Sequence, residues 1–141
     1  MKPYLVLVSH GLFAKHARMS AEMIVGKIEG LYTVCMSDSD GLDGITKKLQ
    51  AVFNEIGDNA SAVIVVDMMA GTPCNIALRV MLSRDNVRIV TGLNLPMVIE
   101  YSVSDEENPD QLAAFLREVG LEAVQNIERP QLPSGEEGYE D

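Results

Sequence analysis

Four short apolar runs divide this chain at regular intervals. They are rich in β-branched and aliphatic residues and show little alternation of polar and apolar positions, which is typical of parallel strands covered on both faces. The runs are "YLVLVS" (4 to 9), "LYTVCMS" (31 to 37), "AVIVVDM" (62 to 68) and "VRIVTG" (87 to 92). We predict a buried strand for each.

The intervals between the runs carry helical periodicity. Apolar residues recur there at spacings close to 3.6, as on the buried face of an amphipathic helix. The three sets are Phe13, Ala17, Ile24 and Ile28; Ile45, Leu49, Val52, Phe53 and Ile56; and Ile76, Ala77, Val80 and Met81. The order βαβαβαβ implies right-handed crossovers, and therefore an α/β fold with a doubly wound parallel sheet and helices on both faces.

A further helix is predicted for residues 109–120. Its apolar face consists of Leu112, Phe115, Leu116 and Val119. Asn108 or Asp110 would cap its start, and Gly120 would end it. The next segment, "LEAVQNI" (121 to 127), fits either a continuation of this helix or a short edge strand, and the pattern leaves both open.

The composition fits one globular domain. The chain has 141 residues, of which 47% are hydrophobic and 23% charged, enough for an apolar core without metal or disulfides. We expect a single domain over residues 1–129. Residues 130–141 form an acidic tail rich in Pro, Gly and Glu, which we expect to be disordered. Cys35 and Cys74 lack the spacing of a disulfide framework or a zinc site, so we interpret both as buried free thiols.

The net charge of −10 excludes some classes of partner. Nucleic acids are bound by clusters of Lys and Arg, which this acidic chain lacks. No apolar run approaches the roughly 20 residues that span a bilayer, and the first residues do not read as a signal peptide. We therefore expect a cytoplasmic protein without a nucleic acid partner and without direct membrane insertion.

A histidine and an aspartate stand at the ends of two predicted strands. His10 follows the first run, and Asp67 closes the third. In open α/β sheets, ligands bind outside the carboxyl ends of the strands, where the strand order reverses. If the first and third strands are neighbours, His10 faces Asp67 across this crevice.

The start of the third predicted helix lies beside the same crevice. Gly71 allows a tight turn, Thr72 suits the N-cap position and Pro73 suits the first helical position. The free N–H groups and positive dipole end of such a helix attract anions. Met68 and Met69, just before the turn, are either core residues or an adaptable docking rim at the mouth of the site.

These residues together favour phosphoryl capture by histidine. A neutral imidazole has one nucleophilic nitrogen. A carboxylate that accepts the hydrogen of the other nitrogen fixes the tautomer and stabilises positive charge on the ring. The same residues could supply half a metal site, but the only other histidine, His16, is expected on the surface of a helix.

The sequence lacks the motifs that bind a nucleotide or a calcium ion. The chain has no P-loop for a nucleotide. "DSDGLDG" (38 to 44) has leucine at a position where a calcium loop needs a ligand, so we interpret Asp43 as a helix cap instead. We expect neither a metal nor another cofactor.

Three segments resemble the signature segments of the mannose-family enzyme IIA (EIIA) proteins of the bacterial phosphoenolpyruvate-dependent sugar phosphotransferase system. They are "VSHG" (8 to 11), "VVDMMAGTPCN" (65 to 75) and "TGLNLPMVIE" (91 to 100), in matching order and spacing. The likeness spans residues 1 to about 129. Ala70 and Cys74 depart from the glycine and phenylalanine that the family often has at these positions, which bears on loop geometry and local packing.

The resemblance implies a phosphotransferase component that carries a phosphoryl group on histidine. His10 would be phosphorylated by HPr and would pass the group to an enzyme IIB partner, which serves a membrane permease during sugar uptake. Asp67 would orient His10, and Gly71 and Thr72 would contact the phosphoryl group. The resemblance also implies a homodimer with parallel strand order 2-1-3-4, in which an antiparallel fifth strand, residues 121–127, is exchanged between subunits.

Two other functions fit the same residues. A phosphotransfer subunit of dihydroxyacetone kinase also uses a histidine at a strand end, although "GTPCN" (71 to 75) and "GLNLPM" (92 to 97) resemble the sugar branch more closely. A non-catalytic regulatory module could use phosphorylation only as a switch. The sequence does not specify the sugar.

Overall fold

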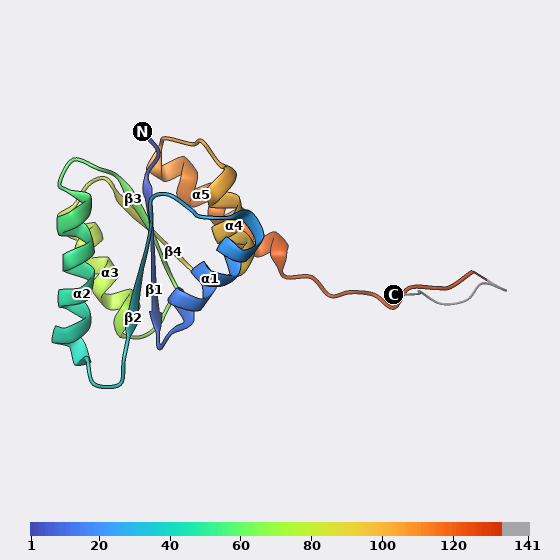
Figure 1. The fold of residues 1–141 in the computed structure, drawn as a ribbon, viewed down its shortest axis with the longest axis horizontal. Coiled ribbons are helices and arrows are strands. Elements are labelled where there is room, and N and C mark those ends of the chain that lie inside the picture. The colour runs from blue at the N-terminus through green and yellow to red at the C-terminus, as the bar shows by residue number, and fades with distance from the viewer. Residues whose placement is uncertain (134–141) are drawn as a thin grey trace.

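A computed structural model describes residues 1–133, and residues 134–141 of the predicted tail lie outside the described residues. Figure 1 shows the ribbon. Its elements in chain order are β1 (Tyr4–His10), α1 (Phe13–Val25), β2 (Leu31–Met36), α2 (Gly41–Ile56), β3 (Ala62–Val66), α3 (Thr72–Ser83), β4 (Val87–Thr91), α4 (Leu95–Val103) and α5 (Pro109–Ala123).

The sheet has the strand order β2-β1-β3-β4 and is parallel throughout. The four predicted strands and their order are therefore confirmed. β1 and β3 are neighbours, in register from Tyr4 opposite Ala62 to Val8 opposite Val66. Their carboxyl ends meet at one end of the sheet, so the loops that follow them also meet there.

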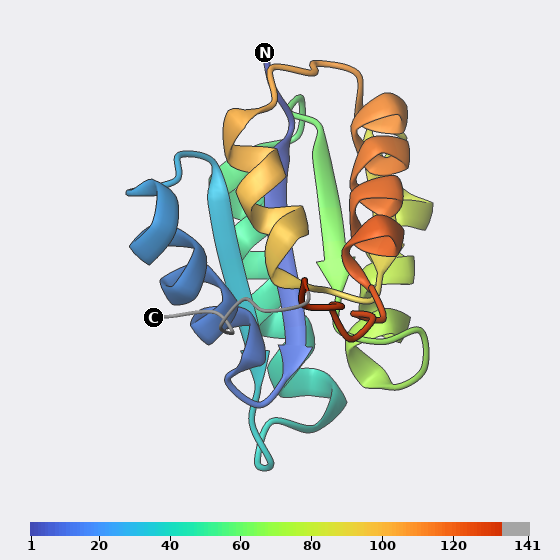
Figure 2. The ribbon, with the colours of Figure 1, turned by 90° about the vertical axis from the view of Figure 1, so that its right-hand side faces the viewer.

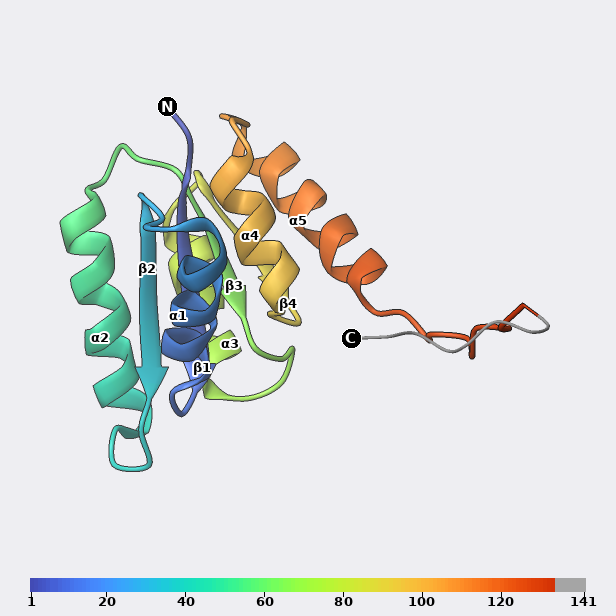
Figure 3. The ribbon, with the colours of Figure 1, turned by 45° about the vertical axis from the view of Figure 1, so that its right-hand side comes forward.

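Helices cover both faces of the sheet. α1, α4 and α5 lie on one face, and α2 and α3 lie on the other (Figures 2 and 3). Along β1, Leu7 belongs to the first core and Val8 to the second. The same alternation turns Ser9 toward α1 and His10 toward α3. None of the helices in residues 1–133 has the length and apolar character needed to cross a membrane.

Helix α1 exists as predicted, but it turns a different face to the core. Ala14, Ala17 and Ala21 are buried, whereas the predicted core residues Phe13 and Ile24 are exposed. Alanine side chains let a helix lie close to a sheet without voids, as dense core packing requires. The small residues of α1 therefore face inward in place of the large ones.

The ends of two helices differ from the predicted positions. Asp40 precedes the first residue of α2, so Asp43, the predicted cap, lies inside the first turn. Asn108 caps α5 with its side chain, as predicted. Gly120 does not end α5, which runs past it. A Cβ atom at Gly120 would lie 3.2 Å from the Met97 sulfur, so this glycine serves the close packing of α5 on α4.

Tyr101 in α4 is the largest fully buried side chain of the described chain. Its hydroxyl donates a 2.7 Å hydrogen bond to the carbonyl of Pro3, just before β1. Burial away from water raises the pKa of Tyr101 to about 12. The bond ties α4 to the start of the central strand.

The two cysteines differ in burial. Cys74 is a buried free thiol, as predicted, but Cys35 is only partly buried. Cys35 belongs to β2, an edge strand of the sheet, and one side of an edge strand has no neighbour to cover it.

The segment after α5 leaves the body of the protein. Residues 121–123 complete α5, and residues 124–133 follow without helix or strand. Figure 1 shows this segment running away from the sheet, and Val124 and Ile127 expose most of their surface. The exchanged strand needs a second chain as its partner, so it stays a prediction.

Candidate functional site

His10 and Asp67 meet at the carboxyl end of the sheet. The distance from His10 Nδ1 to Asp67 Oδ2 is 2.8 Å, and the His10 main-chain N–H donates to the same oxygen over 2.9 Å. β1 ends at His10, and Asp67 directly follows β3, its neighbour in the sheet. Strand order therefore brings together two residues that are 57 positions apart.

The backbone holds the Asp67 carboxylate in place. Oδ1 accepts the Met68 N–H over 2.9 Å, and the Asp67 N–H donates to the Val8 carbonyl over 3.1 Å. The Asp67 side chain is 11% exposed, whereas that of His10 is 42% exposed. The Asp67 carboxylate is thus shielded from solvent and held by the backbone, while the His10 ring that it contacts is accessible to solvent.

This contact selects one tautomer of His10. An ionised carboxylate only accepts hydrogen bonds, so the neutral ring places its hydrogen on Nδ1. Nε2 then keeps its lone pair and is available as a nucleophile.

Gly71 lies against the reactive edge of the His10 ring. A Cβ atom at Gly71 would lie 3.0 Å from both Cε1 and Nε2 of His10. The φ angle of Gly71 is +103°, in a region that L side chains rarely adopt. Both observations require glycine here, and they place the turn before α3 next to Nε2.

The start of α3 differs by one position from the prediction. Gly71 is the N-cap, so Thr72 is the first helical residue and Pro73 the second. The predicted N-cap role of Thr72 is therefore wrong, because the turn conformation of Gly71 takes that position. Within residues 1–133, the Thr72 hydroxyl forms no hydrogen bond, so it stays available to a ligand.

The first turn of α3 can attract an anion. The first N–H groups of a helix have no intrahelical acceptor, and the helix dipole adds positive potential. Pro73 has no N–H, and the Asn75 N–H donates to the Gly71 carbonyl over 3.1 Å. This leaves the N–H groups of Thr72 and Cys74 as the donors at the end of α3 that adjoins His10.

Ser9 supports the turn that presents His10, a role that the sequence pattern did not reveal. Its buried hydroxyl accepts the Ala14 N–H over 2.8 Å and donates to the Gly11 carbonyl over 3.2 Å. It thereby satisfies an N–H at the start of α1 from five positions upstream. The usual capping signal places the serine next to the first helical residue, so this spacing escapes a motif search.

Two other candidates lie outside the immediate site. His16 is exposed on α1, as expected. Met68 and Met69 are both exposed, so the core interpretation of this pair is wrong. The described part of the chain holds no cluster of three or more His, Cys, Asp or Glu side chains suited to a metal ion.

A known protein family matches most of the chain. Residues 4–118 match the EIIA-man family, which is described as the PTS system fructose IIA component. The match begins with β1 and ends within α5, so it includes His10, Asp67, Gly71 and Thr72.

Curated relatives carry related descriptions. The sorbose-specific EIIA component of Lacticaseibacillus casei is 29% identical over 116 residues, which cover 82% of this chain and 83% of that protein. The mannose-specific EIIAB component of Escherichia coli K12 is 25% identical over 125 residues. That match covers 87% of this chain but only 39% of the E. coli protein, so this chain spans about two fifths of that relative.

Solved structures share the fold. The mannose/sorbose specific IIA subunit from Enterococcus faecalis superposes with a TM-score of 0.89 at 43% identity, covering 94% of this chain and 100% of that one. The PTS IIA protein associated with the fucose utilization operon of Streptococcus pneumoniae gives a TM-score of 0.75 at 26% identity, covering 89% and 96%.

Proposed function

This chain belongs to the EIIA-man family and is a component of a sugar phosphotransferase system, and on this basis we propose that it is a cytoplasmic phosphocarrier. In this proposal His10 accepts a phosphoryl group from phospho-HPr and passes it to an enzyme IIB partner. The observation that carries the proposal is the 2.8 Å contact of His10 Nδ1 with Asp67, which directs Nε2 toward the turn before α3.

The proposed transfer exchanges one N–P bond for another. The Nε2 lone pair of neutral His10 attacks the phosphorus of the donor phosphohistidine, and the N–P bond of the donor breaks as the new bond forms. The donor imidazole leaves with the electron pair of its broken bond, so no proton has to move in this step. Asp67 stabilises the positive charge that the His10 ring gains, because it accepts the Nδ1 hydrogen.

The start of α3 is the proposed cradle for the phosphoryl oxygens. Gly71 leaves space beside Nε2, and Thr72 supplies an N–H and a hydroxyl group. Helix N-termini stabilise phosphoryl charge through fixed N–H groups and the dipole. Donors that are already in place stabilise the transition state without reorganisation, and the proposed step draws on no metal or nucleotide.

HPr and enzyme IIB are the proposed protein partners, and the membrane permease is reached only through enzyme IIB. The relatives are named for sorbose, mannose and fructose. Because the proposed carrier handles only the phosphoryl group, the choice of sugar would reside in enzyme IIB and the permease. A dihydroxyacetone kinase subunit or a regulatory module would use His10 in the same way, so the acceptor distinguishes these functions.

We also propose a homodimer that exchanges the segment after α5. A groove of about 860 Å³ lies beside β4 and α5, and Met69 and Arg117 are among the residues that line it. β4 is an edge strand, and such strands pair readily with another chain. A strand formed within residues 121–127 of a second copy would extend the sheet at β4 and cover exposed apolar side chains, including Ile127.

Phosphorylation with enzyme I, HPr and labelled phosphoenolpyruvate tests the carrier function. The wild-type protein should acquire an acid-labile phosphate, and His10→Ala should acquire none. His16→Ala is the matched control, since His16 is exposed on α1, and should label normally. Stable labelling of His10→Ala would refute the assignment. Addition of enzyme IIB should remove the label, and its retention would favour the kinase subunit or the regulatory module.

A further inference from the structure

The two edge strands of the sheet, β2 and β4, each have one side without a neighbouring strand. Alternate residues of such a strand direct their N–H and C=O groups toward the neighbour, and the residues between them direct both groups outward. In β2, the carbonyls of Gly30 and Met36 accept hydrogen bonds from the β1 side over 2.9 and 2.8 Å. Leu31, Thr33 and Cys35 therefore direct their main-chain groups to the open side.

Two basic side chains bind the open side of β2. Arg18 Nη1 donates to the Leu31 carbonyl over 3.1 Å. Lys48 Nζ donates to the Cys35 carbonyl over 3.0 Å. Arg18 belongs to α1 and Lys48 to α2, and Figure 1 shows these helices on either side of β2. Of the outward carbonyls of β2, only that of Thr33 has no side-chain donor within residues 1–133.

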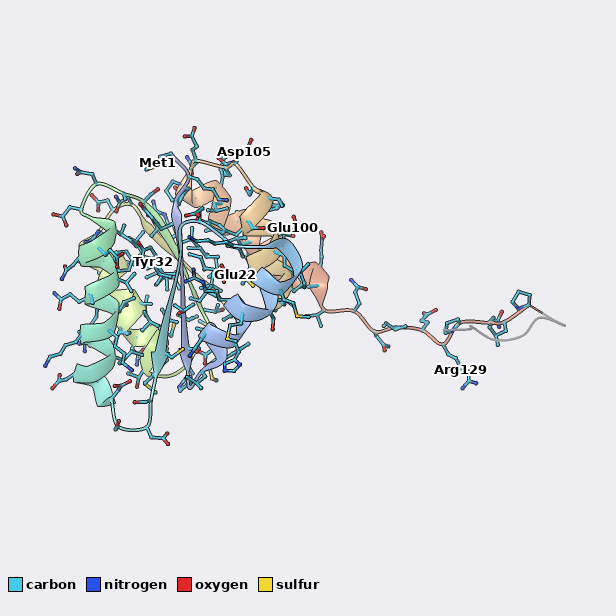
Figure 4. All side chains as sticks on the ribbon, in the orientation of Figure 1. Met1, Glu22, Tyr32, Glu100, Asp105 and Arg129 are labelled. Atoms are coloured by element: carbon cyan, nitrogen blue, oxygen red, sulfur yellow. The ribbon has the colours of Figure 1, made fainter. Side chains whose placement is uncertain are left out.

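Carboxylates hold both basic side chains at this edge. Glu22, which Figure 4 labels, accepts the Arg18 Nε–H over 3.3 Å, one turn further along α1. Asp40 pairs with Lys48 over 2.7 Å. Asp40 also accepts the N–H of Ser37, directly after β2, over 2.7 Å. Side chains from both faces of the sheet are thus fixed across the open side of β2.

The open side of β4 is covered only at its start. The Asn86 carbonyl accepts a hydrogen bond from β3 over 3.1 Å, so the alternation directs the main-chain groups of Val87, Ile89 and Thr91 outward. Arg88 Nη1 donates to the Val87 carbonyl over 2.9 Å. In the part of the chain that the structure describes, no side chain binds the main-chain groups of Ile89 or Thr91. The sheet therefore has one closed edge and one open edge.

We propose that Arg18 and Lys48, named here the edge guards, close β2 against the addition of a strand from a second copy of this chain. An incoming β2 strand needs the Leu31 and Cys35 carbonyls for its own ladder, so it must first displace both guards. Charged side chains at an edge are a common protection against such pairing. The inference rests on the proposed homodimer only for the use of β4.

Closure of β2 determines where the assembly ends. Exchange of strands at β4 joins two copies through two identical contacts, and such a contact is complete with two chains. If β2 also accepted strands, one dimer could add to the next, and the sheets would extend without a limit. The edge guards would therefore restrict the protein to the dimer.

Removal of the guard hydrogen bonds tests this role. The double variant Arg18→Met with Lys48→Met keeps two unbranched side chains but removes their donors. Sedimentation velocity should show species larger than those of the wild type at protein concentrations at least about tenfold lower, because two carbonyls become available to a second copy. Lys47→Met with Arg79→Met is the matched control. It removes the same charges, and within residues 1–133 these two side chains form no hydrogen bond or ion pair.

Amide hydrogen exchange, measured by NMR, locates the new contact. In the guard variant, exchange of the Leu31, Thr33 and Cys35 amides should slow as the protein concentration rises. In the wild type and the control, exchange of these amides should not depend on concentration. Lys48→Met alone leaves the contact of Arg18 with its carbonyl in place and should give a smaller increase of the same kind. Thermal unfolding of each variant verifies the fold.

The outcomes separate the edge guards from the homodimer. A guard variant that sediments like the wild type would overturn the guard role. Larger species with unchanged exchange of the β2 amides would overturn it as well, because association would then occur at another surface. A monomeric wild type would contradict strand exchange at β4 alone, and removal of the guards should then still produce dimers joined through β2.

Discussion

Asp67 binds His10 twice through one oxygen atom. Oδ2 accepts both the ring Nδ1–H and the main-chain N–H of His10, at 2.8 and 2.9 Å. The ring is therefore anchored to the same group as the end of β1, and the direction of Nε2 is tied to the backbone. We infer that Asp67 both orients the ring and stabilises the charge that phosphorylation places on it.

Replacement of Asp67 by Asn should slow phosphorylation without unfolding the protein. The amide keeps the shape of the side chain but loses the charge, and its NH2 group favours the wrong tautomer of His10. A hydrogen bond to a charged group contributes about 1.5–3 kcal/mol, so we expect a decrease of about 10- to 100-fold in the rate. Rapid-quench transfer from phospho-HPr measures the rate, and ¹⁵N NMR reports the tautomer. Wild-type rates with an unchanged tautomer would contradict the orienting role.

The apolar pattern predicted most of the fold because the positions that become buried are mostly occupied by apolar residues. Strands covered on both faces must be apolar throughout, so the four runs and their alternation with helices were readable. The order of the strands in the sheet came from the family resemblance, because the apolar pattern does not say which strands are neighbours. The pattern was misleading for α1, where Ala14 and Ala21 face the core and the larger Phe13 does not. Size alone does not decide burial, since a helix can lie close to a sheet only through small side chains.

The candidate site was predictable where a general rule for strand ends applies. The contact of His10 with Asp67 follows from the position of both at the carboxyl ends of neighbouring strands. The approach of Gly71 to the ring and the bonds of Ser9 depend on turn geometry, which residue types alone do not specify. The Thr72 cap was misplaced for the same reason, because the φ angle of Gly71 shifts the start of α3.

Gly71→Ala should abolish phosphorylation through a steric clash with His10. The new Cβ would lie 3.0 Å from Nε2 and Cε1, so the ring must shift away from the start of α3. The backbone of Gly71, with φ 103° and ψ 175°, lies in a region that is essentially open only to glycine, which adds a cost of about 1–3 kcal/mol in stability. Transfer from phospho-HPr should fall by at least about 100-fold, since small displacements of reacting groups have effects of this size.

Gly57→Ala is the matched control for this experiment. Gly57 has a similar φ of +94°, but a Cβ atom there would meet nothing within 4 Å. The Gly57→Ala variant should lose a similar free energy of unfolding, measured in urea, and should keep the transfer rate of the wild-type protein. Equal transfer rates in the two variants would show that contact with Gly71 does not govern the position of the ring.

The segment after α5 should control the oligomeric state. Val124→Asp with Ile127→Asp places charges where an exchanged strand would be covered, and burial of an unpaired charge is costly. We expect sedimentation equilibrium to give a dimer for the wild type and a monomer for this variant. Val103, at the end of α4, is also largely exposed, and the control Val103→Asp should stay dimeric. A monomeric wild type, or a dimeric variant, would contradict strand exchange.

Tyr101 should make the protein sensitive to alkaline pH. Burial raises its pKa to about 12, above the ordinary value of 10, so the folded state holds the hydroxyl proton more tightly than the unfolded state. This stabilisation is complete below about pH 10 and is lost as the pH rises from about 10 to about 12, by about 2–3 kcal/mol in total. Tyr101→Phe removes this pH-dependent loss. At pH 7 it costs about 1 kcal/mol, because the Pro3 carbonyl loses its donor. Urea unfolding of both proteins at pH 7, 10 and 11.5 measures the difference, and parallel stability curves over this range would show that the hydroxyl is not buried in the folded protein.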